Sequence, residues 1–412
     1  MASTTRTYLA SDWQVWTYKP VAGNFRLDFS ALNGTDVLGA VGDVGGMAVL
    51  DLNIAGINIQ DGERPNQSVF GIVSPGTATI TATYYGWSND LVKELYPGKS
   101  IAITLKNQSA HDVDVYGRNS VFFEGTISSS NYSVDPINEV TAFNIECEDI
   151  LSNALNQSVE VIRSTSATKS SSIFAAIDGN PQLFAPHLNI SPDIDLTANF
   201  ESNTTESRSL GTWLEDFIQT YVAIPINRWQ INLSDELERE VLLQALHTQP
   251  TSGTQITGSD ITNIVLATDG ADIPTSFNLS NSTLSYNYAP TINSVLTLPL
   301  NYTATLDVNG STQIQQVATR ISSYTSELSP VEITVKTATT YQDITFDSTH
   351  PHAHGIKYWP TTWYANGTDI DIYVDFFATA GITPHYYTKI VGQSHEITPD
   401  YWHTTYQLLK GR

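Results

Sequence analysis

The sequence predicts a mainly β protein with a few helices, an α+β fold class, and three observations support this. Hydrophobic residues make up 41% of the 412 residues and charged residues only 15%, so the chain can bury a core but is short of charge. Its 18 prolines and 25 glycines divide it into many short segments. Several segments alternate apolar with polar residues, which is the period of a strand with one buried face. The length allows roughly two to four domains.

The first part of the chain is expected to consist of strands joined by turns. Residues 47–59 alternate clearly, with Leu50, Leu52 and Ile54 on one side. Residues 96–99 place Pro before Gly, as a β-turn does, just before an alternating run. The strands expected here cover residues 25–32, 47–59, 76–82, 100–105, 121–127 and 141–147. The last of them is expected to continue into a short helix over residues 148–156.

Two apolar stripes at helical spacing predict amphipathic helices further along. The first begins at Ser209, is ended by Pro225, and consists of Leu210, Trp213, Leu214, Phe217, Ile218 and Tyr221. The second covers residues 311–328 and is stopped by Pro330. Residues 233–245 are also expected to form a helix, with Ser234 as its N-cap. Strands are expected at 261–267, 294–305 and 331–335.

The charge balance argues against binding to nucleic acid through phosphate contacts. The formal net charge is −23 with only 19 Lys and Arg, so the chain would repel DNA and anionic membranes. No Lys or Arg lies between Lys169 and Arg208, and none lies between Arg239 and Arg320.

The sequence also carries expectations about export and cross-linking. Cys147 is the only cysteine, so no disulfide can form within the chain. The N-terminal stretch lacks the plan of a signal peptide, and no run of about 18 apolar residues occurs. We therefore expect a protein that is made in a cytosol, is not exported and has no helix across a membrane.

The C-terminal segment 386–409 is expected to be a hairpin, and it carries a resemblance. Two β-rich runs flank the turn Thr398-Pro399-Asp400, in which Pro presets φ. The segment resembles the closing hairpin of minor tail, or baseplate hub, proteins of long-tailed (siphovirus-type) bacteriophages, especially those of actinobacterial hosts. The family pattern G-x-x-H-x-I-x-P-x-x-W-x-x-x-L is matched by Gly392, His395, Ile397, Pro399 and Trp402, with Tyr406 in place of the last Leu.

Four further segments follow the order seen in the same family, namely Gly76 to Ile80, Pro97 to Ile103, Phe122 to Ile127 and Ile145 to Leu155. The resemblance covers about residues 20–157 and 310–409. It implies two tail-tube-like β-barrel modules joined by a small α/β region. The implied domains are a first barrel module over residues 1–160, a connecting region with amphipathic helices over 161–260, and a second barrel module over 261–412.

The resemblance implies a virion structural protein at the phage tail tip, assembled in the host cytoplasm. Its expected role is a trimeric, ring-shaped hub that joins the tail tube to the tip and lines the DNA exit channel. Expected partners are other copies of the chain, the distal tail or tail-tube protein, the tape measure protein, and downstream tip or fibre proteins, with transient passage of phage DNA. Two alternatives are a hexameric distal tail adaptor and a carbohydrate-binding or glycan-degrading tail-tip protein.

Two groups of polar residues have the types and spacing of candidate metal or catalytic sites. His350, His352 and His354 alternate, so their imidazoles could converge on a metal, but a polar loop is the favoured interpretation. Asp369, Asp371 and Asp375 could hydrolyse a glycoside or bind calcium, but a solvated strand face is favoured.

Other candidates also have structural interpretations. Glu146, Glu148 and Asp149 are expected at a helix N-terminus, which favours negative charge. The aromatic residues Trp359, Trp363, Tyr364 and Trp402 could bind sugars, but buried or interface anchors are favoured. His247 shows no triad pattern, and His395 and His403 are expected to pack or form hydrogen bonds. We therefore expect no catalytic residue, no cofactor, no metal and no enzyme activity.

Overall fold

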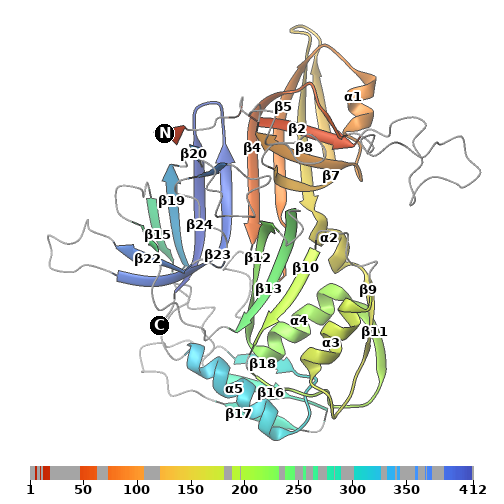
Figure 1. Cartoon of the computed structure of the whole chain (residues 1–412), viewed down its shortest axis with the longest axis vertical. Helices are drawn as coiled ribbons and strands as arrows, with labels where there is room; N and C mark the ends of the chain where they lie inside the picture. Colours follow the sequence, from red (N-terminus) through yellow and green to blue (C-terminus); the bar gives the residue numbers. More distant parts are fainter. Residues whose placement is uncertain are drawn as a thin grey trace, which may run out of the picture.

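The fold is mainly β, as the sequence predicts; in Figure 1 most of the helices lie in the lower half, whereas the helix Asn89–Glu94 lies near the top. It is a computed structural model, which describes residues 5–6, 10, 13–18, 47–62, 73–105, 121–180, 188–194, 196–231, 237–245, 254–256, 263–267, 276–282, 284–288, 301–325, 332–338, 341–343, 358–360, 367, 369–373 and 385–410. No described helix has the length and apolar character needed to cross a membrane.

A 13-stranded sheet runs through both the first and the last parts of the chain. Its order is β15 (Asn263–Ala267), β19 (Glu332–Ala338), β24 (Trp402–Lys410), β23 (His385–Ile397), β4 (Asn53–Gly62), β5 (Thr77–Tyr85), β8 (Val140–Asp149), β7 (Val121–Asp135), β6 (Ser100–Leu105), β2 (Trp13–Tyr18) and β3 (Met47–Val49). Off this path, β22 (Asp369–Tyr373) pairs with β23 and with β14 (Thr254–Ile256).

The two parts of this sheet meet where β4 pairs with β23. The pairing is antiparallel and runs from Gly62 opposite Gly392 to Ile57 opposite Ile397. The core of the first part includes Ile397 and Trp402 from the C-terminal hairpin. The expectation of two separate barrels stays a prediction, because the described strands of both parts form one sheet.

A central three-stranded sheet lies between the large sheet and the helices in Figure 1. It consists of β10 (Leu188–Asp193), β13 (Leu237–Ala245) and β12 (Ala223–Ile231), with β13 in the middle. The elements around it are α2 (Ile150–Leu155), β9 (Ser158–Ile162), α3 (Lys169–Asp178), β11 (Thr205–Ser209), α4 (Leu210–Tyr221), β16 (Ser276–Ser280), β17 (Ser285–Tyr288), β18 (Asn301–Thr305) and α5 (Ser311–Thr325). The remaining elements are α1 (Asn89–Glu94), β1 (Thr5–Arg6), β20 (Tyr341–Asp343) and β21 (Tyr358–Pro360).

The second hydrophobic core is built around α4. Its stripe contributes Leu210, Trp213, Leu214, Phe217 and Ile218, all buried. The segment 276–325 contributes to this same core through Leu279, Leu306, Val308, Ile314, Val317 and Ala318. In this respect the packing differs from the expected arrangement, which placed residues 276–325 in the second barrel module. The domain boundaries themselves stay predictions.

Most expected elements that fall on described residues are confirmed. α4 has Ser209 as its N-cap and ends at Tyr221, with Val222 as its C-cap at φ 52°. Pro225 lies in β12 and does not end the helix. α5 occupies Ser311–Thr325 of the expected second amphipathic helix. The expected strand at 25–32 lies outside the described residues.

The expected helix at 233–245 is wrong, because Leu237–Ala245 is the strand β13. Val241, Leu243 and Ala245 are buried, and the residues between them are only half-buried. This period of two fits the strand, which pairs with β10 on one side and with β12 on the other. These pairings are contacts between distant segments, and they override the local helix signals.

Candidate functional site in buried charge clusters

One buried charge cluster joins the large sheet to the central sheet. Arg239 on β13 contacts Asp61 near the end of β4 and Asp149 at the end of β8. Its Nη2 pairs with Asp61 Oδ1, and its Nε lies 3.0 Å from Asp149 Oδ2. All three residues are buried, Arg239 and Asp149 completely. The cluster therefore ties together three strands from two sheets.

Backbone groups complete the surroundings of Asp149. Its Oδ2 accepts a hydrogen bond from the Gly76 N–H at 2.8 Å, and its Oδ1 accepts one from the Leu151 N–H at 3.0 Å. A Cβ on Gly76 would lie 2.9 Å from Asp149 Oδ2, so this close approach requires glycine. Asp149 is the N-cap of α2, which confirms the predicted helix N-terminus. Glu146 and Glu148 instead accept hydrogen bonds from nearby serine hydroxyls.

Two carboxylates and one guanidinium leave this cluster with one net negative charge when all three are ionised. Burial raises the pKa of Asp149 to about 6, although the charge of Arg239 acts in the opposite direction. Burial also disfavours the charged form of Arg239, but Asp61 and Asp149 outweigh it and raise the Arg239 pKa. The Arg239 guanidinium therefore stays charged, whereas Asp149 gains a proton as the pH falls through about 6.

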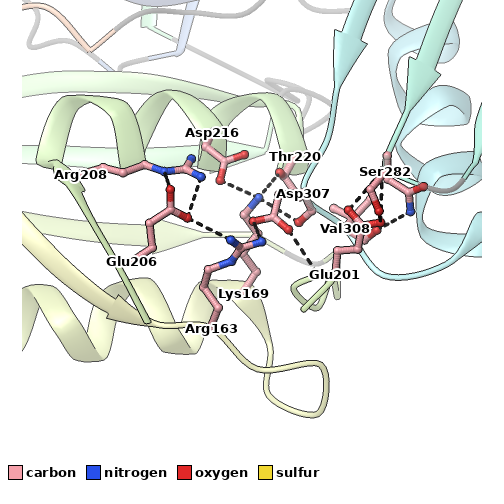
Figure 2. Close-up of polar contacts among 11 residues, drawn as sticks. Arg163, Lys169, Glu201, Glu206, Arg208, Asp216, Thr220, Ser282, Asp307 and Val308 are labelled. Atoms are coloured by element: carbon pink, nitrogen blue, oxygen red, sulfur yellow. Dashed lines mark hydrogen bonds and ion pairs between the residues drawn. The ribbon is translucent and has the colours of Figure 1, made fainter. Parts of the chain in front are cut away.

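A second charge cluster lies among the helices and loops beside the central sheet (Figure 2). Lys169, the first residue of α3, is completely buried. Its Nζ lies 2.7 Å from Asp216 Oδ2 and donates hydrogen bonds to Thr220 Oγ1 at 3.0 Å and to the Asp307 carbonyl oxygen at 3.2 Å. Burial lowers the pKa of Lys169, and Asp216 acts against that shift. Lys169 therefore links α3, α4 and the segment after β18.

Two arginines extend this second cluster. Arg163 pairs with Glu206 at 2.9 Å and with Asp307 at 2.7 Å. Arg208 donates to both oxygens of Glu206, at 2.7 and 2.8 Å, and its hydrogen bond lowers the pKa of Glu206. The Arg208 guanidinium also lies 4.7 Å from the ring centroid of Trp213, where cation–π attraction adds to the pairing.

The C-terminal hairpin forms a third, largely uncharged junction. The Trp402 ring meets the Trp13 ring edge-on, with centroids 5.2 Å apart, so β24 packs against β2 although the two strands are far apart in the sequence. His395 is buried, with Nδ1 3.0 Å from Thr404 Oγ1, and burial lowers its pKa to about 3. It therefore stays neutral and acts as a packing and hydrogen-bonding residue, as predicted. His403 is half-buried and stacks on Tyr401, with centroids 4.3 Å apart.

The structure places only some of the other candidate residues. Asp369 lies opposite Lys389 in the β22–β23 pairing and forms an ion pair with it at 2.8 Å, so it is not merely a solvated acid. The backbones of Asp371 and Trp359 lie in β22 and β21. The candidates outside the described residues are His247, His350, His352, His354, Trp363, Tyr364 and Asp375. Within the described part of the chain, no three His, Cys, Asp or Glu side chains are arranged to hold a metal ion.

The two charge clusters are suited to holding elements together. Within them, carboxylates and cations lie at ion-pair distance from each other, and such compensated buried charges resist separation. Sequence reasoning did not single out Asp61, Arg163, Lys169 or Arg239 as site residues. Lys169 and Arg239 each border a long stretch without Lys or Arg, but Arg208 and Arg320 border the same two stretches and are only half-buried, so this pattern does not identify the buried cations.

The comparisons with known proteins concern the fold. No protein-family model matches the chain, and no curated protein matches it in sequence. The crystal structure of the tail protein from Neisseria meningitidis MC58 has a TM-score of 0.54 and 11% identity, covering 89% of this chain and 94% of that one. The 43 kDa tail protein of prophage MuSo2 from Shewanella oneidensis has a TM-score of 0.52 and 7% identity, covering 97% and 96%. The chain therefore shares the fold of these two tail proteins.

Proposed function

We propose that the chain is a structural protein of the distal tail of a long-tailed bacteriophage, where it forms a hub ring that joins the tail tube to the tip. The observation that carries this proposal is the likeness of fold to two tail proteins over at least 89% of the chain. The order of the Gly76, Pro97, Phe122 and Ile145 segments and the C-terminal hairpin support the same role. The proposed role is assembly, without a catalytic site.

In the proposed ring, each of three copies supplies two β-rich parts, one from the first and one from the last part of the chain. Six such parts would match a sixfold tube above and a threefold tip below. The pairing of β4 with β23 supports this arrangement, because it fixes the two parts of one chain relative to each other. The Arg239 cluster supports it further, since it holds both strands β4 and β8 against the central sheet.

The acidic balance supports a channel through which DNA passes. The net charge is −23, and Arg163, Lys169, Arg208 and Arg239 are engaged in internal ion pairs. A lumen lined with cations would hold phosphates, whereas an acidic lumen lets DNA slide. A tail reconstruction with a basic lumen formed by this chain would contradict this part of the proposal.

Imaging of the tails of particles that contain the chain tests the proposed role. We expect one ring of three copies between the tube and the tip. Six copies in a ring would favour the distal tail adaptor, and absence of the chain from the tail would contradict the proposal altogether. The glycan alternative predicts wall-glycan binding lost on Trp363→Ala, and reducing-sugar release lost on Asp371→Asn. We expect neither activity.

A further inference from the structure

The turn between β7 and β8 lies near the end of β5, at the top of Figure 1. This region carries a concentration of exposed apolar side chains. Nine large hydrophobic residues are exposed in the described part of the chain, and five of them lie here. They are Tyr85, Trp87, Tyr132, Val134 and Ile137, with exposed fractions of 75%, 48%, 50%, 49% and 89%. Tyr85 is paired with Val140 and therefore lies on the other face of the sheet from Tyr132 and Val134, which are paired with Phe143 and Thr141. We call the other four residues, Trp87, Tyr132, Val134 and Ile137, the hairpin-tip patch. Exposed apolar residues that are grouped in this way mark interaction sites.

Part of this patch continues the inner face of the sheet beyond the core. Tyr132 lies opposite Phe143 in the β7–β8 pairing, so the two side chains share a face, and Phe143 is buried. The ring centroids of Tyr132 and Phe143 are 6.2 Å apart, and those of Trp87 and Tyr132 are 5.5 Å apart. An aromatic row therefore leads from the core to the exposed end of the hairpin.

The turn that presents Ile137 is held by hydrogen bonds. Asp135 Oδ1 accepts from the backbone N–H groups of Ile137 at 2.9 Å and Asn138 at 3.1 Å. The Glu139 carbonyl accepts from the Gly86 N–H at 2.6 Å, which ties the turn to the end of β5. Ile137 is thus presented on a backbone that is already ordered, so little conformational entropy is lost when it binds a partner.

The rim of the patch is acidic. Asp135 is the last residue of β7 and Glu139 is the last residue of the turn, and the Asn138 side-chain hydrogen bond lowers the pKa of Asp135, which keeps it anionic. We propose that the hairpin-tip patch docks into an apolar groove, bordered by Lys and Arg, on a different protein of the same particle. This inference rests on the proposed tail role, because the partner is sought among the neighbouring tail proteins.

Charge distinguishes the proposed groove from two other possible partners of the patch, a second copy of the chain and an anionic membrane. A second copy of the chain would bring 42 Asp and Glu against 19 Lys and Arg, and several of those cations are already used internally. An anionic membrane would repel Asp135 and Glu139 at the point of insertion. A groove with a basic border complements both the apolar tip and its acidic rim.

Photo-crosslinking in assembled particles tests the inference. Benzoylphenylalanine replaces Ile137, and as a matched control it replaces Ile162, which is 71% exposed on β9. We expect crosslinks from position 137 to one other tail protein, at a segment with Lys or Arg beside apolar residues, at about tenfold or more the yield from position 162. When Glu139→Lys is added to the chain that carries benzoylphenylalanine at position 137, the crosslinking yield should fall several-fold, because a lysine would be repelled by the basic border of the groove. The amount of folded chain should not change.

Several results would overturn the inference. These are equal yields from positions 137 and 162, crosslinks from 137 only to a second copy of the chain, or a yield that Glu139→Lys leaves unchanged. Flotation of the purified chain with phosphatidylcholine–phosphatidylglycerol vesicles, lost on Ile137→Ser, would replace the protein partner with a membrane. If the chain is missing from tails, the proposed function fails; if it is present without the expected crosslinks, only the docking inference fails.

Discussion

Arg239 compensates two carboxylates that have little access to water. We expect Arg239→Leu to lower the free energy of unfolding by about 3–5 kcal/mol, because Asp61 and Asp149 remain buried without their counter-ion. Denaturant unfolding measures this loss. Lys93→Leu is the control, since Lys93 on α1 pairs with Asp90 while most of both side chains is exposed. There we expect a loss of about 1 kcal/mol or less, and equal losses would contradict the account.

The pH dependence of Asp149 runs opposite to that of an ordinary ion-paired acid. Its pKa is raised from 3.8 to about 6 in the folded chain, so the folded state binds this proton more tightly than the unfolded state. Its contribution to stability is therefore fully present below pH 3.8 and is lost as the pH rises through about 6. We expect the stability advantage of the wild type over Asp149→Asn to be largest near pH 4 and smallest above pH 6.

Glu206 provides the control for this measurement, because its pKa is lowered in the folded chain by the hydrogen bond from Arg208. Its contribution is present above its ordinary pKa and is lost as the pH falls. The advantage over Glu206→Gln should therefore shrink towards acid pH while the advantage over Asp149→Asn grows. Denaturant unfolding at several pH values shows both trends, and parallel trends for the two variants would sink the assignment.

Single residues also show how far sequence reasoning reaches. His395 could be assigned to packing because its partner Trp402 is local in the hairpin, whereas the contact of Trp402 with the distant Trp13 could not be predicted. The partners of Arg239 could not be predicted, because Arg239 and Asp61 are 178 residues apart and meet only when two sheets come together. Residues 240–319 contain no Lys or Arg, but this stretch is bordered by the half-buried Arg320 as well as by Arg239, so it indicates neither the burial of Arg239 nor its carboxylate partners.

The pairing of β7 with β8 depends on a residue without a side chain. Gly125 lies opposite Asp149, and a Cβ on Gly125 would lie 2.0 Å from the Glu148 carbonyl oxygen, which as a backbone atom cannot move aside alone. We expect Gly125→Ala to lower the free energy of unfolding by about 1–3 kcal/mol or more. Gly56→Ala on β4 is the control, because its Cβ would lie 3.7 Å from the nearest atom, an ordinary contact. Thermal unfolding should separate the two variants clearly, and similar melting temperatures would contradict the expectation.

Whole elements were predictable where the pattern was local and unambiguous. The α4 stripe falls at helical spacing behind the N-cap Ser209, and the helix forms there. β13 was misassigned because Ser234 and the Leu-rich run suit a helix locally, while its two strand partners are distant in sequence. α3 was missed because its first turn is Ser-rich, although Thr168 caps it and Ile173, Phe174 and Ile177 are buried.

The shared sheet couples parts of the molecule that lie far apart in the sequence. Ile397 ends β23 beside β4 and belongs to the core of the first part, with Ile57 as its direct partner. Leu408 on β24 is equally buried but is absent from that core, and its strand partner is Ile333. The C-terminal hairpin therefore has one side that supports the first part of the chain and another that supports β19.

Hydrogen exchange on the full chain tests this coupling. We expect Ile397→Ala to lower the free energy of unfolding by about 2–5 kcal/mol, since it removes a buried side chain. Amide exchange should accelerate in β4 and β5 as well as in β23 and β24, because local openings spread through shared strands and core. Leu408→Ala should accelerate exchange mainly in β19, β23 and β24. Unchanged exchange in β5 of the Ile397→Ala chain would show that the two parts of the sheet open independently, and it would remove the rigid pairing on which the proposed ring depends.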